Sequence, residues 1–204
     1  MAKIKLTKTE LKTQSDALRR FQRFLPMLQL KKQQLQAELS LIAAQLEEVS
    51  AREAAARKEL STWITLFSET GVELDRLVTV NSVVTDTSNI AGVAIPVFKR
   101  LDVTVADLDL FATPAWLDAA AAMIQSILSI KAERRVLDQQ HECVTAELKT
   151  TAQRVNLFEK VKIPECIENI RIVKIAIGEA QTASVTRGKI AKSRNRQPGQ
   201  EDAA

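Results

Sequence analysis

The chain has 204 residues, of which 46% are hydrophobic but only 4% aromatic, with no Tyr. Its apolar content is therefore mostly Ala, Leu, Ile and Val, which suits seams between helices better than a thick globular core. No apolar run approaches the ~20 residues of a membrane span, and the N-terminus lacks a signal-peptide core. We expect no direct membrane insertion and a cytosolic protein, or one docked to something at the membrane.

The net charge of +4 is unevenly distributed along the chain. Residues 1–32 hold nine Lys and Arg against two acids, and residues 187–196 hold five basic residues and no acid. Residues 68–118 hold eight acids against three basic residues. The chain is therefore basic at both termini and acidic in the middle, and such charged segments are candidate contact surfaces for partners of opposite charge.

Residues 1–70 carry a heptad pattern and are predicted to form an N-terminal coiled-coil arm. One row of positions repeats every seven residues: Phe21, Leu28, Leu35, Ile42, Val49, Ala56 and Trp63. A companion row lies four residues on: Leu18, Leu25, Leu39, Leu46, Leu60 and Phe67. Only Lys32 and Glu53 interrupt the companion row. A 3.5-residue period predicts a left-handed supercoil with a second helix.

Two local features bear on this first helix. Thr7 or Thr9 suits its N-terminal cap, and Thr7 with Glu10 has the spacing of a capping box. Pro26 lies inside the heptad pattern and lacks a backbone donor, so it should either bend the helix or break it at Leu25. The heptad phase is kept across Pro26, which favours the bend.

Residues 71–114 are predicted to form a central hairpin lobe. Residues 76–85 and 93–105 are rich in β-branched side chains, and the turn-forming cluster DTSNIAG separates them. Pro96 restricts the second strand to an edge position. Thr113 followed by Pro114 predicts a helix start, with Pro at the first helical position.

Residues 115–192 are predicted to form the C-terminal arm that pairs with the first. A seven-residue repeat runs through Ile130, Leu137, Val144, Thr151 and Phe158, with Leu148 and Val155 as companions. At Ile163–Pro164 the phase shifts, and the pattern continues through Ile163, Ile167, Ile170, Val173 and Ile177. Residues 193–204 are polar, lack a core pattern, and are expected to form a disordered tail.

The predicted fold is dominated by α-helix: a long antiparallel two-helix coiled coil with a small β-hairpin-like lobe between its arms. The two basic termini should meet at one tip and the acidic lobe should lie at the other. The expected seam consists of Phe21, Leu28, Leu35, Leu39, Ile42, Leu46, Val49, Leu137, Val144, Leu148, Val155 and Phe158.

The residues of catalysis and metal binding are scarce. Cys143 and Cys166 are 23 residues apart on one predicted helix, roughly 35 Å, so they cannot pair within the chain, and free thiols fit a reducing compartment. The one histidine, His141, flanks the seam and has no partner ligands at suitable spacing. No Gly-rich phosphate loop exists. We expect no catalytic residue, no metal and no cofactor.

Several sequence stretches resemble the D subunit of V-type and archaeal-type ATPases. LTKTEL (6–11) and LKKQQL (30–35) resemble the family's TKSEL and LKxKRDEL patterns, and NIAGVAIPVF (89–98) is similar to NIxGVxVP. The most specific stretch is QRVNLFEKVKIPECIENIRIV (153–173), which resembles RRVNALExVxIPxLxxTIxYI. The resemblance covers the whole chain in order and spacing.

The resemblance implies a non-catalytic rotor shaft of a rotary ATPase, on the inner face of the membrane. Its partners would be a ring of catalytic A and regulatory B subunits, the small F subunit, and the C-type socket subunit of the membrane ring. Nucleotides would bind to the ring. The alternatives are a coiled-coil scaffold or spacer and a nucleic-acid-associated coiled coil; the lack of aromatic stacking residues argues against nucleic acid.

Two partner surfaces are expected on this basis. Apolar residues beyond the needs of one seam predict the small-subunit site: Leu60, Ile64, Phe67, Ile124, Ile127 and Leu128. Basic residues near the two termini predict the contact with the A/B ring: Arg19, Arg20, Arg23, Arg187, Lys189, Lys192 and Arg194. The alternative for the basic residues is a solvated helix surface.

Overall fold

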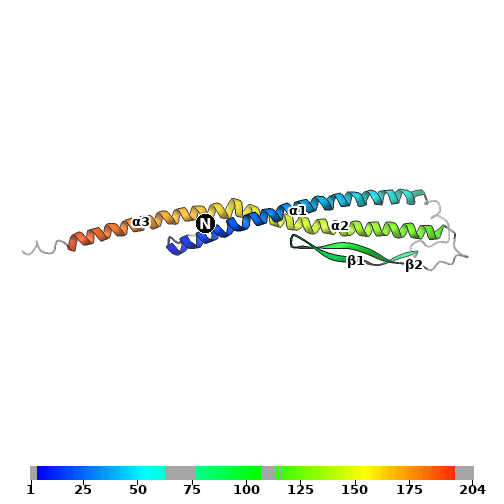
Figure 1. The fold of residues 1–204 in the computed structure, drawn as a ribbon, viewed down its shortest axis with the longest axis horizontal. Coiled ribbons are helices and arrows are strands. Elements are labelled where there is room, and N and C mark those ends of the chain that lie inside the picture. Colours follow the sequence, from blue (N-terminus) through cyan, green and yellow to red (C-terminus); the bar gives the residue numbers. More distant parts are fainter. Residues whose placement is uncertain (1–3, 63–76, 107–113, 115, 196–204) are drawn as a thin grey trace, which may run out of the picture. The chain divides into compact units, whose positions relative to one another are not determined.

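The computed structural model describes residues 4–62, 77–106, 114 and 116–195. Their elements are helix α1 (Lys8–Thr62), strands β1 (Val78–Ile90) and β2 (Val93–Val105), helix α2 (Leu117–Leu157), the π-helical turn η3 (Phe158–Lys162) and helix α3 (Ile163–Asn195) (Figure 1). They fall into two compact units. Residues 30–151 form the hairpin unit, and residues 1–29 with 152–204 form the terminal unit. The predicted helical coiled coil with a small antiparallel hairpin between its arms is confirmed.

Helix α1 forms because its sequence contains no Gly and a single Pro. Thr7 caps its start: the Thr7 hydroxyl accepts a hydrogen bond from the Glu10 N–H at 3.3 Å, as a capping box requires. Pro26 lies inside α1, and the helix continues through it. The alternative of a helix break at Leu25 is therefore excluded.

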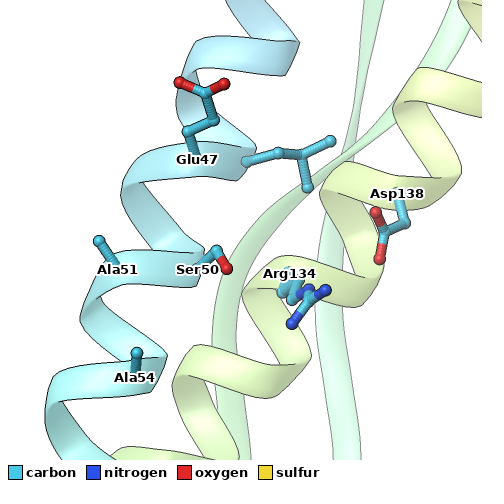
Figure 2. A pocket seen from close by; sticks show the side chains of 7 residues that line it. Glu47, Ser50, Ala51, Ala54, Arg134 and Asp138 are labelled. Atoms are coloured by element: carbon cyan, nitrogen blue, oxygen red, sulfur yellow. The ribbon is translucent and has the colours of Figure 1, made fainter.

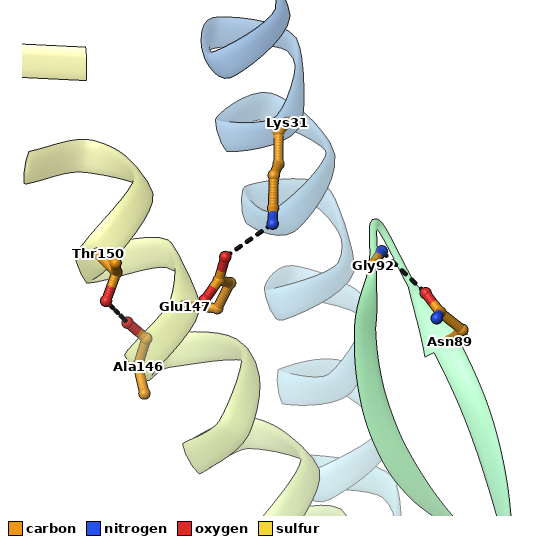
Figure 3. A network of polar contacts seen from close by, with 6 residues as sticks. All are labelled: Lys31, Asn89, Gly92, Ala146, Glu147 and Thr150. Carbon is orange, nitrogen blue, oxygen red and sulfur yellow. Dashed lines mark hydrogen bonds and ion pairs between the residues drawn. The ribbon is translucent and has the colours of Figure 1, made fainter. Parts of the chain in front are cut away.

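In the hairpin unit, α1 and α2 run antiparallel. The Lys31 ammonium contacts Glu147 at 2.7 Å (Figure 3), and the Arg52 guanidinium contacts Glu133 at 2.9 Å. As the residue number rises along α1, that of the partner on α2 falls, which is the antiparallel arrangement. The start of α2 differs from the prediction, because the helix begins at Leu117 and Pro114 precedes it. The Pro114 carbonyl accepts from the Leu117 N–H at 3.1 Å, and Thr113 lies outside the described residues.

The two strands form an antiparallel hairpin closed by the pair Ile90 and Val93. Ala91 and Gly92 make the turn, with φ of 50° and 82°. Positive φ at both turn residues is the type I′ geometry that matches strand twist. The Asn89 side chain supports the turn by accepting from the Gly92 N–H at 2.8 Å (Figure 3). The predicted first strand, 76–85, was too short, because this two-residue turn leaves residues 86–90 free to pair with β2.

The hairpin packs along the helix pair. Ile95 is buried in one cluster with Leu35, Ile42 and Val144, and near the other end of the hairpin Leu77 is buried with Leu117. The described part of the predicted acidic lobe therefore lies along the helices and not at their tip. Its acids are paired, Asp86 with Lys99 at 2.9 Å and Asp102 with Arg100 at 3.0 Å, and most other acids of the predicted lobe lie outside the described residues.

In the terminal unit, the start of α1 packs on η3 and α3. The rings of Phe21 and Phe158 lie 5.0 Å apart, and the Asn169 amide donates to Gln14 at 3.5 Å. Higher residue numbers of α1 again meet lower ones of the partner, so this pair is also antiparallel. From Gly178 to Asn195, the residues of α3 are exposed and nothing in the described chain covers them. The first residues assigned to a tail, 193–195, are part of α3.

The turn η3 explains the phase shift of the second arm. The Ile163 N–H bonds to the Phe158 carbonyl, five residues back, so the turn holds one residue more than an α-turn. The buried stripe then resumes at Cys166 and Val173. Of the residues predicted to continue the pattern, Val173 is buried and Ile163, Ile170 and Ile177 are half-buried. Only the prediction for Ile167 is wrong, because that side chain is 52% exposed.

None of the helices in the described ranges has the length and hydropathy that crossing a bilayer requires.

Candidate interaction surfaces

The predicted seam residues lie at the helix contacts of the two units. Six are buried: Leu35, Ile42, Val49, Leu137, Val144 and Val155. Six are half-buried: Phe21, Leu28, Leu39, Leu46, Leu148 and Phe158. Leu35 and Val144 are fully inaccessible to solvent, and Leu39, Leu46 and Leu148 pack around them. Burial of such side chains stabilises each contact by about 1.5–3 kcal/mol.

Glu53, which interrupts the heptad row, is buried beside the seam. One carboxylate oxygen contacts Arg57 at 2.6 Å and the other contacts Arg134 at 2.7 Å. The hydrogen bond from Arg134 lowers the pKa of the Glu53 carboxyl, against the opposing effect of burial. The sequence shows that Glu53 interrupts the heptad row and that Arg57 lies four residues on. It does not show that Arg134 of α2 pairs with Glu53, because that contact depends on the fold.

A shallow groove of about 580 Å³ runs beside this ion pair between α1 and α2. Figure 2 shows Ser50 of α1 pointing toward Arg134 of α2. The small side chains of α1 leave the groove open, and it is lined by Leu46, Glu47, Ser50, Ala51, Ala54, Arg134 and Asp138. The described residues hold no cluster of three metal-ligating side chains.

The predicted ring-contact residues are all exposed, but they form two separate groups. Arg19, Arg20 and Arg23 lie on α1 at the level of the Phe21–Phe158 contact. Arg187 follows Phe158 by 29 residues, which is about 40 Å of helix. The predicted convergence of the basic residues at one tip is therefore wrong. The second group, which also includes Lys189, Lys192 and Arg194, lies on the part of α3 that extends past the start of α1.

The predicted small-subunit residues have mixed positions. Leu60 and Leu128 are partly exposed, whereas Ile64 and Phe67 lie outside the described residues. Ile127 is only 7% exposed, and Ile124 packs against Leu117 and Ala121. Two of the six therefore contribute to the interior of the hairpin unit.

A groove of about 850 Å³ in the terminal unit was not expected from the sequence. It forms where the segment before α1 lies against η3 and α3. Its apolar lining comes from Ile4, Val161, Pro164 and Ile172, and its rim is charged: Lys5, Glu10, Lys160, Glu165 and Glu168. The wide turn η3, which sequence periodicity does not reveal, places Val161 and Pro164 there.

The two thiols differ in environment. Cys143 is exposed and Cys166 is buried, and burial raises the pKa of the Cys166 thiol. His141 is half-buried beside the seam.

The chain is similar to known proteins over nearly its whole length. A family model for the D subunit of ATP synthase matches residues 10–193. The chain is 43% identical over 193 residues to the V-type ATP synthase D subunit of Borreliella burgdorferi, covering 95% of both chains. It is 30% identical over 198 residues to the protein of that name from Chlamydia trachomatis, covering 96% of this chain and 98% of the other. The corresponding Chlamydia pneumoniae protein is 28% identical over 193 residues, covering 94% and 92%.

Proposed function

Because the chain belongs to the family of ATP synthase D subunits, we propose that it is the non-catalytic central-stalk rotor subunit of a V-type rotary ATPase. In this role it transmits torque between a ring of catalytic A and regulatory B subunits and the ion-translocating ring of the membrane. The stalk would lie on the inner face of the membrane, with nucleotides bound by the ring.

The observation that supports this proposal best is the pairing of long, uninterrupted helices. Helix α1 has 55 residues, and in the hairpin unit it is fixed to α2 by a buried seam and by ion pairs. A shaft must resist twisting, and close-packed side chains leave little room for helices to slide past each other.

The exposed basic residues fit a bearing inside an acidic ring. Individual exposed charges contribute little, about 0–1 kcal/mol each, so they attract the ring without fixing one orientation. The exposed end of α3, where Val185 is 59% and Ile190 is 50% exposed, offers further surface for the ring.

The small F subunit would bind near the end of α1 and the start of α2. Because Ile127 is buried within this chain, the partly exposed Leu60 and Leu128 are the better candidates for contact, together with Ile64 and Phe67. The C-type socket subunit would bind below them and connect the shaft to the membrane ring.

The test is to reconstitute the complex in vesicles with and without this chain. We expect the A/B ring alone to hydrolyse ATP, but ATP-driven ion transport to require the chain. Equal transport by vesicles lacking the chain would rule out a rotor and favour a scaffold. A Leu60→Asp and Leu128→Asp variant should lose the small subunit yet keep the ring; Leu41→Asp, at a 57% exposed position of α1, is the matched control.

A further inference from the structure

Strand β1 presents an unusually open edge. The sheet has two strands, so one edge of β1 pairs with β2, and in the described part of the chain no strand pairs with the other. Ten of the 13 residues of β1 are exposed, and the rest are half-buried. An unpaired edge offers a row of backbone donors and acceptors to another chain.

The other outer edge, that of β2, faces the helices. The buried Gln140 of α2 donates its side-chain amide to the Pro96 carbonyl at 2.5 Å. That carbonyl therefore points away from β1, and Pro96 has no N–H to offer in either direction. The packing of Ile95 against Leu35 and Val144 covers the same strand.

This contact also identifies which groups of β1 face outward. Thr87 pairs directly with Pro96. In an antiparallel ladder the backbone N–H and C=O groups of two opposite residues either point toward each other or both point away from the partner strand. The backbone groups of Thr87 therefore point away from β2. Consistent with this, the Thr87 N–H donates to the Asp86 carboxylate at 2.9 Å. The register is unbroken from Thr85 to Ile90, so Thr85 and Asn89 face outward too.

The sequence of β1 lacks most of the features that protect an edge strand. It contains no Pro, Gly, Lys or Arg, and eight of its 13 residues are Val, Thr or Ile. Its one charge, Asp86, is paired with Lys99 of β2. By contrast, β2 carries Pro96, Lys99 and Arg100. Proteins usually protect exposed edges with charges, Pro, bulges or short strands. The register shifts of β1 all lie before Thr85, so the regular stretch from Thr85 to Ile90 is the part of this edge that suits a partner.

We propose that the outer edge of β1, centred on Thr85–Asn89, pairs with an extended strand of another subunit of the complex. This inference rests on the proposed function for the presence of other subunits. The strand would gain backbone hydrogen bonds from Thr85 and Asn89, and from Thr87 once its N–H exchanges the Asp86 carboxylate for a carbonyl of the partner, the mode known as β-augmentation. Because the exposed side chains of β1 are almost all neutral, the partner segment should be extended, rich in β-branched residues and low in charge.

The proposal is tested by residue-resolved hydrogen–deuterium exchange on the full chain, alone and within the reconstituted complex. In the isolated chain the outward amides of Thr85 and Asn89 should exchange fast, whereas the inward amides of Ser88 and Ile90 should be protected. In the complex the outward amides should slow by about a hundredfold or more. Unchanged outward amides in an assembled complex would overturn the strand pairing. Assembly itself is measured separately by co-purification of the ring, which tests the proposed function.

Two variants separate strand addition from simple coverage. Thr87→Pro removes an outward N–H and its bond to the Asp86 carboxylate without removing a hydrogen bond to β2, and Thr87→Ala keeps that N–H. We expect Thr87→Pro to abolish the new protection at Thr85 and Asn89, and Thr87→Ala to retain it. Equal protection in both variants would mean that a surface merely covers the hairpin. Outward protection in the isolated chain that grows with its concentration would assign the edge to a second copy and also overturn the proposal.

Discussion

Glu53 combines deep burial with full pairing. Its side chain is 4% exposed, whereas the guanidiniums of Arg57 and Arg134 remain 59% and 45% exposed. The arginines therefore keep much of their hydration while neutralising the buried charge, which limits the cost of burying an ion. An ion pair between Glu53 and Arg134 is satisfied in only one register of the helices, so we infer that it fixes their alignment.

The Glu53→Gln substitution should reveal this pairing through pH. The pKa of Glu53 is lowered in the folded chain, so its stabilising contribution is present above the unfolded pKa of about 4.3 and is lost as the pH falls through the folded value. We expect the variant to lose about 1 kcal/mol of unfolding free energy at pH 7. The difference from wild type should vanish at acid pH.

Denaturant unfolding at a series of pH values measures this difference. The control is Glu168→Gln, which removes an exposed ion pair with Arg171. This pair also lowers the pKa of the Glu168 carboxyl. It should leave stability nearly unchanged. A Glu53→Gln effect independent of pH would show that the carboxylate charge does not stabilise the pair.

At the scale of the elements, the π-helical turn η3 keeps the buried stripe on one face. Between Phe158 and Cys166 the stripe contains one residue more than the heptad repeat allows, and a π-turn absorbs one extra residue. Pro164 is the second residue after this turn, and its ring would crowd the carbonyl four residues back in a regular α-helix. Two causes, phase and proline, therefore favour the same turn.

The Pro164→Ala substitution distinguishes these causes. If the phase of the stripe requires the turn, Cys166 remains buried in the variant and its reaction with a thiol reagent stays at least about tenfold slower than that of the exposed Cys143. Single-thiol versions, made with Cys143→Ser or Cys166→Ser, give each rate separately. If Cys166 of the variant instead reacts as fast as Cys143, proline alone holds the turn.

The elements also show what the sequence predicts well. The heptads gave the seam from Phe21 to Phe158 because a repeat of 3.5 residues has few alternatives over such a length. The phase shift near Pro164 was visible and placed Val173 correctly, but the burial of Cys166 in place of Ile167 was not predicted, since periodicity does not reveal a π-turn. The length of β1 was underestimated because Ala91–Gly92 adopts positive φ without the usual Asn-Gly signal. The contacts of Gln140 and Arg134 depend on tertiary packing and had no local signal.

At the scale of the whole molecule, the two basic groups should act independently. One lies on α1 around Arg20 and the other on α3 around Lys189, well beyond the distance at which neighbouring substitutions couple. Replacing Arg19, Arg20 and Arg23 by Glu should weaken binding to the A/B ring and reduce its dependence on salt. Neutralising Arg187, Lys189, Lys192 and Arg194 should do the same, and the two losses of binding free energy should add within about 0.5 kcal/mol.

Titration of the purified ring with each variant measures these losses, and unfolding curves confirm that the seam is unaffected. A combined loss much smaller than the sum would mean that both groups serve one contact. Wild-type affinity in both variants would make the basic residues a solvated surface.

Rotation of this chain inside the ring is the most direct test of the rotor role. Cys143 is exposed and Cys166 is buried, so a thiol-reactive biotin should label the folded chain at one position of α2. With the A/B ring immobilised and a bead attached through that biotin, ATP should drive rotation of the bead in one direction, and rotation should stop when ATP is removed. A bead that shows no net rotation while the same ring hydrolyses ATP would contradict the assignment of this chain as the rotor.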